Sequence, residues 1–213
     1  RRVLFRSEGQ AAIELEALAR AQAELGHDVS LLATDPNAPE SGRIEREGPL
    51  HVGLFRRNWP GRICWSAGLR ATLQRERVDL VHHHALWLRT LHYAHVAARL
   101  HGAPLVVSPR GMMGPWAWRH HRTRKALADR LLHPGALGAV DGWHATSAQE
   151  ARDIAALGFH QPVCVAPNGV DSPTEHAVEA ARAYWSPLTR DLTGRRVALF
   201  YSRLHRKIGR AHV

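Results

Sequence analysis

The residues of this chain best suited to chemistry are three successive histidines, His82 to His84, and an arginine held between proline and glycine, Arg110. Alternate residues of a strand share a face, so His82 and His84 point together while His83 points away. Two imidazoles do not close a zinc site, and no third ligand stands at a diagnostic spacing. We therefore expect no metal, and keep as an alternative a His-rich metal-dependent hydrolase that His92 and His95 could complete.

Arg110 belongs to the phrase Ser108-Pro109-Arg110-Gly111. Pro109 bars helix continuation and Gly111 permits unusual backbone angles, which predicts a shaped loop around the arginine. The fork of an arginine suits a phosphate or an acidic group of a substrate. The alternative is an arginine paired with a structural carboxylate.

A second candidate anion site is the start of the helix expected after Thr146. Ser147-Ala148-Gln149-Glu150 fits a capping box, which predicts that Ser147 begins a helix. A helix amino-terminus favours an anion, although the serine can equally do no more than satisfy helix amides.

The segment from residue 116 to 132 combines aromatic and basic residues. Trp116 and Trp118 could stack on a sugar, but packing in the core or at its rim is the preferred interpretation. A basic face is either a solvated helix surface or a contact with anionic lipid, and consists of Arg119, Arg122, Arg124 and Lys125. If the lipid contact were its whole role, the protein would be a non-catalytic membrane-associated binding module.

The elements that must position these residues alternate between strand and helix. Helices are expected at 11–25, 63–75, 86–100, 116–132 and 147–157, and strands at 29–33, 50–55, 78–83, 104–107, 142–145 and 163–166. Such alternation is typical of an α/β fold with a doubly wound parallel sheet, whose ligands bind at the carboxyl edge of the strands. No G-x-G-x-x-G or Walker motif is present, which argues against a dehydrogenase or a P-loop NTPase.

Four phrases that fall where expected strands end are matched in one known family. They are Val81 to His84, Ser108 to Met112, His144 to Ser147, and Pro167 to Asp171. In this order they resemble the amino-terminal half of the family-four retaining glycosyltransferases of GT-B type, most closely the bacterial members that build polysaccharides. The resemblance implies a Rossmann-like sheet, followed by only the start of a second Rossmann-like domain.

The resemblance also implies an activity and its participants. A member of this family transfers a sugar from a nucleotide-sugar to a glycan or lipid-linked acceptor with retained configuration, without a cofactor, a metal or a nucleic-acid partner. The implied site residues are an acceptor-side cleft at His84, Ser108, Arg110, Gly111 and Ser147, a hinge turn at Asn168 and Gly169, and Arg203 on the donor diphosphate. No catalytic residue is assigned.

The chain departs from the family pattern at several positions. Ala85 stands where the family has glycine, and the Ser108 loop stands where many members place a cleft histidine. Met113 and Gly114 replace a Leu-Glu pair of close relatives. Ser202 and Arg206 also depart from the diphosphate-binding phrase that contains Arg203. A histidine role at the Ser108 loop and a carboxylate role at Gly114 are therefore not transferred.

Both ends of the chain read like translated nucleic-acid adapter. Residues 1–7 can be encoded by AGACGTGTGCTCTTCCGATCT. Residues 207–213 can be encoded by A followed by AGATCGGAAGAGCACACGTC, which is the reverse complement of the first string without its last letter. Such segments are excluded from fold reasoning, and residue 207 of the true gene stays unassigned. We expect adapter-derived scars at 1–7 and 207–213, an amino-terminal glycosyltransferase domain at 8–171, an interdomain linker with one short helix at 172–194, and the first strand of a truncated donor-binding domain at 195–206.

Two expectations follow for these ends. Val3-Leu4-Phe5 is apolar enough to imitate the first strand of the family, so we expect it in the central slot of the sheet. Residues 195–213 hold one strand without neighbours, so we expect them to be loosely packed.

Charge and cysteine content argue against two further classes of protein, nucleic-acid-binding proteins and disulfide-rich proteins. The chain has 29 Lys and Arg against 19 Asp and Glu, a net charge of +10. The end segments hold five of these cations and no acid, which leaves 24 basic and 19 acidic residues and a net of +5. That surplus is too small to indicate nucleic-acid binding. Two cysteines exclude a disulfide framework, which favours a cytoplasmic protein, with the inner face of the plasma membrane as a further location.

Overall fold

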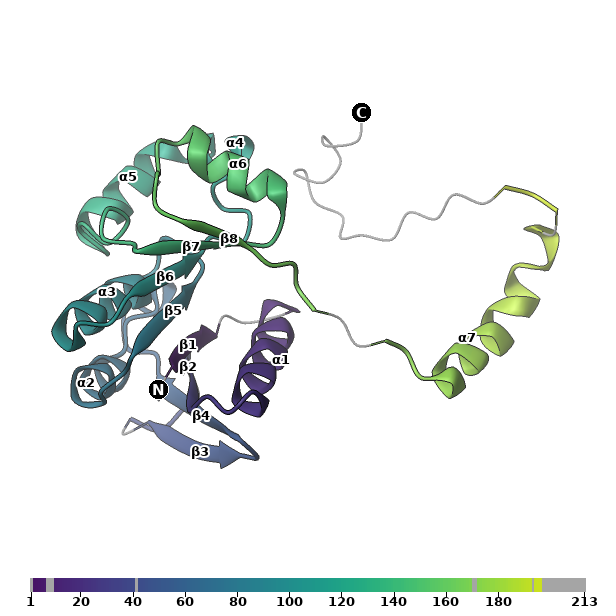
Figure 1. Ribbon diagram of the computed structural model, residues 1–213, viewed down its shortest axis with the longest axis horizontal. Helices are drawn as coiled ribbons and strands as arrows, with labels where there is room; N and C mark the ends of the chain where they lie inside the picture. The colour runs from purple at the N-terminus through teal and green to yellow at the C-terminus, as the bar shows by residue number, and fades with distance from the viewer. Residues whose placement is uncertain (1, 7–9, 41, 170–171, 193, 197–213) are drawn as a thin grey trace. The chain divides into compact units, whose positions relative to one another are not determined.

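The computed structural model describes residues 2–6, 10–40, 42–169, 172–192 and 194–196 (Figure 1). The chain divides into two compact units, residues 1–169 and 170–213. The first unit holds a sheet and the helices that cover it, and the second holds the helix α7 (Glu175–Leu188) and a turn of 3-10 helix, η2 (Arg190–Leu192).

The strands of the described residues form one sheet in the order β3-β4-β2-β1-β5-β6-β7-β8. All neighbours are parallel except β3 and β4, which form an antiparallel pair at one edge. The strands are β1 (Arg2–Arg6), β2 (Val29–Asp35), β3 (Arg43–Glu47), β4 (Leu50–Arg56), β5 (Leu80–His84), β6 (Leu105–Ser108), β7 (Gly142–Ala145) and β8 (Val163–Val165).

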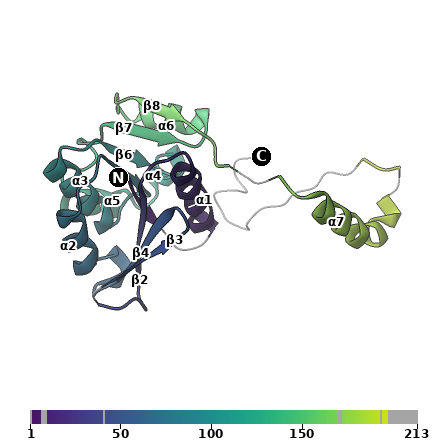
Figure 2. The same ribbon diagram turned by 60° about the horizontal axis from the view of Figure 1, so that its bottom comes forward.

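Helices lie on both sides of these strands, with α1 on one side and α2 and α3 on the other (Figures 1 and 2). The helical elements of the first unit are α1 (Gln10–Glu24), η1 (Gly61–Ile63), α2 (Ala67–Arg75), α3 (Arg89–His101), α4 (Pro115–Arg119), α5 (Arg122–Leu131) and α6 (Ala148–Ala156). Central strands covered on both sides are buried on both faces, as β2 and β5 are at all but one residue each.

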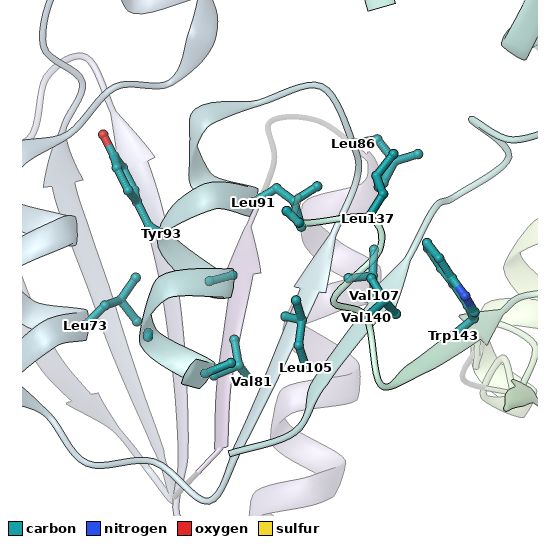
Figure 3. Packing of buried hydrophobic residues seen from close by; sticks show 14 of the residues in the cluster. Leu73, Val81, Leu86, Leu91, Tyr93, Leu105, Val107, Leu137, Val140 and Trp143 are labelled. Carbon is teal, nitrogen blue, oxygen red and sulfur yellow. The ribbon is translucent and has the colours of Figure 1, made fainter. Parts of the chain in front are cut away.

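Two clusters of buried side chains hold the layers together. On the α1 side, Ala19 and Ala23 pack on Val29 and Leu31 of β2 and on β4. The larger cluster joins Leu73 of α2 and Leu91 of α3 to Val81, Leu105 and Val107 of the central strands, and extends to Trp143 of β7 (Figure 3). Both clusters contain residues from elements that are far apart in the sequence. Their packing therefore fixes the relative positions of the strand ends.

The predicted fold class, an α/β doubly wound parallel Rossmann-like sheet, is confirmed. Without the edge strand β3, the strands follow the order of a dinucleotide-binding sheet, and the order reverses between β1 and β5. This reversal is the topological switch point, where open α/β sheets bind their ligands. The predicted central position of Val3-Leu4-Phe5 is also confirmed, because β1 pairs with β2 on one side and with β5 on the other.

Three predicted helices were wrong in their bounds. The helix expected at 116–132 is two helices, because the backbone of His121 is left-handed (φ 55°) between α4 and α5. The helix expected from Ile63 begins only at Ala67, after a left-handed Cys64 (φ 56°) and a cap in which Ser66 accepts from the amide of Leu69. The helix expected from Leu86 begins at Arg89, after left-handed Trp87.

Two further differences concern the edges of the fold. The strand β3 was not predicted, because Arg-Ile-Glu-Arg-Glu is exposed throughout and lacks an apolar face. The short helix expected within 172–194 is the helix α7, which is 14 residues long and contains Pro187. Most of the segment 195–213, including all residues from 197 on, lies outside the described residues, so its predicted loose packing stays a prediction.

Candidate functional site

The predicted residues gather at the switch point of the sheet. His84 ends β5, Ser108 ends β6, and Ala145 ends β7, so the loops after them share one edge. Glu14 in α1 belongs to the helix that follows β1, on the other side of the reversal. The loops therefore converge on the crevice where this class of sheet binds ligands.

Arg110 is the centre of this group. Its backbone is left-handed (φ 53°), and its guanidinium donates to His84 Nδ1 at 3.3 Å and to Glu14 Oε2 at 3.3 Å. It also donates to the side-chain oxygen of Asn168, whose amide nitrogen donates to Glu14 Oε2 at 2.7 Å. Burial lowers the pKa of Arg110, and the charges of Glu14 and Glu150 oppose that shift. The structural pairing with a carboxylate, considered above as the alternative, is thus present.

His84 is fixed in one tautomer by this contact. An arginine has no acceptor, so Nδ1 of His84 must accept and the ring proton must sit on Nε2. Nε2 is buried and has no hydrogen-bond partner among the described residues. Burial lowers the pKa of His84 well below 6.5, and the neighbouring His82, Arg110, His83 and His144 lower it further. The side chain is therefore a neutral donor at ordinary pH.

Two more histidines surround it. As predicted for alternate residues of a strand, the rings of His82 and His84 lie on one face, 4.2 Å apart. The ring of His144 on β7 lies 5.2 Å from His82 and 6.3 Å from His84. Within the described ranges, no group of three His, Cys, Asp or Glu residues has an arrangement that could hold a metal ion.

Glu150 shapes the loop that carries Arg110. One carboxylate oxygen accepts from the amide of Gly111 at 2.5 Å, and the other accepts from the amide and hydroxyl of Thr146 at 2.7 and 2.8 Å. Ser147 caps α6, because its hydroxyl accepts from the amide of Glu150 at 3.2 Å. The predicted helix start is confirmed, but Glu150 returns to Thr146 and Gly111 rather than to the capping serine.

Ser108 and Gly111 have structural contacts in the site. Ser108 is fully buried and its hydroxyl donates to the carbonyl of His144 at 3.0 Å, which ties the end of β6 to β7. Gly111 has φ 74°, a left-handed conformation that residues with a side chain rarely adopt. Gly169, which follows Asn168, is the last residue of the first unit. The predicted site residue Arg203 lies outside the described residues.

The predicted basic face is divided by the structure. Arg119, Arg122 and Arg124 are exposed, but Lys125 is half-buried, donates to the carbonyl of Ala117 and lies 5.7 Å from the ring centre of Trp87. Of the tryptophans, Trp116 stacks on His120 at 4.7 Å, and Trp118 packs on Trp87 at 5.3 Å.

Sequence reasoning missed two members of the site. Glu14 carries no local signal, because its partners Arg110 and Asn168 are 96 and 154 residues away. Glu150 was visible as the last residue of a capping box, yet its contact with Gly111 spans 39 residues. Only the folded sheet brings these groups together.

The buried histidine His83 gives a testable dependence of stability on pH. Burial lowers its pKa from 6.5 to about 3, since the ring lies inside the core with Nδ1 near the carbonyl of Ala85 and Nε2 near the hydroxyl of Thr90. The unfolded state then binds more protons than the folded state below pH 6.5, so the stability contributed by neutral His83 is lost as pH falls towards 3. We expect the free energy of unfolding, measured in denaturant, to fall by a few kcal/mol across this window. A His83→Gln variant should show a shallower dependence, and an unchanged slope would contradict the assignment.

Comparison with known proteins settles the family. Residues 13–172 match the family model described as Glycosyltransferase Family 4. The chain belongs to Glycosyltransferase Family 4. No curated protein gave a match. The match covers the whole sheet from β2 to β8 and every loop of the Arg110 group.

Solved structures share the fold at low sequence identity. Two structures of sucrose-phosphate synthase from Thermosynechococcus elongatus align with TM-scores of 0.53 and 0.58 at 17% and 15% identity, covering 91% and 87% of this chain. HepE from Anabaena in complex with UDP-glucose aligns with a TM-score of 0.55 at 15% identity over 87% of this chain. The alignment covers 100% of the first synthase chain, but only 52% of the second and 50% of HepE, so this chain spans about half of these two proteins. The likeness shows the amino-terminal half of a GT-B fold. None of the described helices is long and apolar enough to cross a membrane.

Proposed function

We propose that this chain is the acceptor-side half of a cytoplasmic, retaining glycosyltransferase that acts in polysaccharide biosynthesis, with a nucleotide-sugar as donor and a glycan or lipid-linked acceptor. The observation that carries the proposal is the Arg110 group at the switch point, in a chain of Glycosyltransferase Family 4. HepE was solved with UDP-glucose, which supports a nucleotide-sugar donor.

In this proposal His84 is the group that meets the sugars. Its neutral ring carries a proton on Nε2, and this donor has no acceptor among the described residues. Nε2 is covered in this structure, so the proposal requires the side chains around it to move before a sugar hydroxyl can accept its hydrogen bond. That hydrogen bond would satisfy a polar group that is otherwise buried without a partner. Arg110 acts through His84, by fixing its tautomer and its orientation.

The proposed reaction also requires that the negative charge on the leaving diphosphate be stabilised. The bond between the donor sugar and its diphosphate breaks, the acceptor oxygen bonds to the same sugar carbon, and the acceptor proton passes to the diphosphate. Arg203 and a second Rossmann-like domain are proposed to hold the leaving diphosphate, with help from the amino-terminus of α6. The Asn168-Gly169 turn is proposed as the hinge between the domains.

The stereochemistry of the product tests the retaining mechanism. The enzyme completed by its donor domain would be incubated with a nucleotide-sugar and an acceptor, and the anomeric configuration of the first product read by proton NMR. We expect the anomeric configuration of the donor to be kept. An inverted product would reject retention while leaving sugar transfer intact.

A contact with an anionic membrane is proposed for the exposed part of the basic face, now Arg119, Arg122 and Arg124 without Lys125. Each cation near an anionic surface is worth about 1 kcal/mol, so the double reversal Arg119→Glu and Arg124→Glu should weaken binding to phosphatidylglycerol vesicles at least tenfold. Vesicle co-sedimentation measures this, with phosphatidylcholine vesicles as the uncharged comparison. The reversal of Arg70 and Arg99, which are exposed on α2 and α3, is the matched control. Equal loss in both double variants would show an effect of net charge alone.

A further inference from the structure

A pocket of about 440 Å³ lies against α5, and none of its lining residues belongs to the Arg110 group. Its walls combine the aromatic side chains of Trp87, Trp118 and Phe159 with the charged side chains of Arg122, Lys125 and Asp129. The volume lies within the range of small-molecule pockets, about 300–1,000 Å³. The lining therefore indicates the class of ligand.

The aromatic walls suit a ring that has an apolar face. Trp87 and Trp118 are half-buried, with ring centres 5.3 Å apart and planes tilted by 53°. Because the two indoles are tilted rather than stacked face to face, they leave flat apolar surface for a ligand. Large aromatic side chains supply much of the energy of binding sites. The C–H face of a pyranose fits such a surface, whereas a flexible alkyl chain gains nothing from the charges around it.

The charges select an anion. Arg122 is exposed and has no hydrogen bond or ion pair to the described residues, so its guanidinium is available to a carboxylate or phosphate. Lys125 adds a second positive charge, although its ammonium already donates to the carbonyl of Ala117. Asp129, 3.3 Å from His133 Nδ1, keeps about half of its side chain exposed and can accept from hydroxyls. The lining carries two cations and one anion.

We propose that this pocket is a second carbohydrate site, which takes a pyranose that carries one anionic group, either a carboxylate or a phosphate. The ring stacks on Trp118 and Trp87, its carboxylate or phosphate pairs with Arg122, and a hydroxyl donates to Asp129. A sugar acid and a sugar phosphate share this chemistry. None of the pocket's lining residues is a proposed acceptor-side residue, and the proposal does not depend on the proposed reaction.

Ligand-observed NMR titrations of the 213-residue chain test the proposal, with glucuronate, glucose 6-phosphate, glucose and UDP as probes. We expect one or both charged sugars to bind more tightly than glucose, and the stronger of the two identifies the source of the charge. Arg122→Ala should weaken the charged sugars about tenfold or more, the loss of one charged hydrogen bond, and leave glucose unchanged. Trp118→Ala should weaken all three sugars roughly fivefold.

The matched control is Arg130→Ala, because Arg130 is exposed on the same helix and does not line the pocket. Neither arginine is buried, and α5 has no buried residue, so these variants leave the core intact. Arg122→Lys, which keeps the charge without the fork, should bind with intermediate affinity. Equal binding of charged and neutral sugars, no binding of either charged sugar, insensitivity to Arg122→Ala, or preferential binding of UDP at this pocket would each overturn the proposal.

Discussion

Replacing Arg110 by alanine in the enzyme completed by its donor domain is expected to lower kcat/KM at least tenfold. The change removes the donor that fixes the tautomer of His84, and it leaves Glu14 without its cation. One hydrogen bond to a charged group is worth about 1.5–3 kcal/mol, or about tenfold to a hundredfold in rate if its effect is expressed in the transition state. Initial rates over a range of acceptor concentrations measure the loss.

The pH dependence separates this positioning role from a merely structural one. The charge of Arg110 helps to lower the pKa of His84, so its removal raises that pKa. If neutral His84 is the active form, the acid limb of the kcat/KM profile should move to higher pH in Arg110→Ala. Arg152→Ala is the control, since Arg152 is exposed and its described contact is with Gln149 of its own helix. If Arg110→Ala kept full activity and the acid limb of its kcat/KM profile did not move, Arg110 would have only a structural role.

Glu150 is expected to give the largest loss of stability among the site residues. Its carboxylate accepts three hydrogen bonds, from Gly111 and Thr146, and only 5% of the residue is exposed. Glu150→Ala removes the carboxylate that accepts from two backbone amides, and we expect the free energy of unfolding to fall by about 2–4 kcal/mol. Chemical denaturation measures this.

Two further variants sharpen the test of Glu150. Glu150→Gln keeps one acceptor oxygen and should lose about half as much. Gln149→Ala changes an exposed residue of the same helix and should stay within about 0.5 kcal/mol of the parent. A Glu150→Ala variant as stable as Gln149→Ala would show that these hydrogen bonds contribute little.

The parts of the fold that local sequence determines could be predicted. Strands expected to end at residues 83, 107 and 145 end at His84, Ser108 and Ala145, and a parallel sheet brings such ends to one edge. The serine of the capping box started α6 as predicted, because its hydroxyl accepts an amide only three residues away. The shared face of His82 and His84 followed from the alternation of a strand.

What could not be predicted depends on the three-dimensional arrangement. Glu14 becomes a site residue only because β1 and β5 are neighbours, which places α1 beside the loop after β6. The break between α4 and α5 falls at His121, where neither glycine nor proline marks it. The burial of Lys125 follows from that break, since it lets the ammonium reach the carbonyl of Ala117.

The central claim is that this chain supplies the acceptor side of a two-domain glycosyltransferase. The most direct test compares sugar transfer by the 213-residue chain with transfer by the same chain joined to the donor domain of a close relative. A panel of nucleotide-sugars and glycan or lipid-linked acceptors would be used, and labelled product counted. Holding both substrates in register can be worth roughly 7–11 kcal/mol of the barrier, so the chain alone should give no detectable product and the joined protein should turn over. Transfer by the chain alone, or a correctly folded joined protein that transfers from no nucleotide-sugar, would contradict the account.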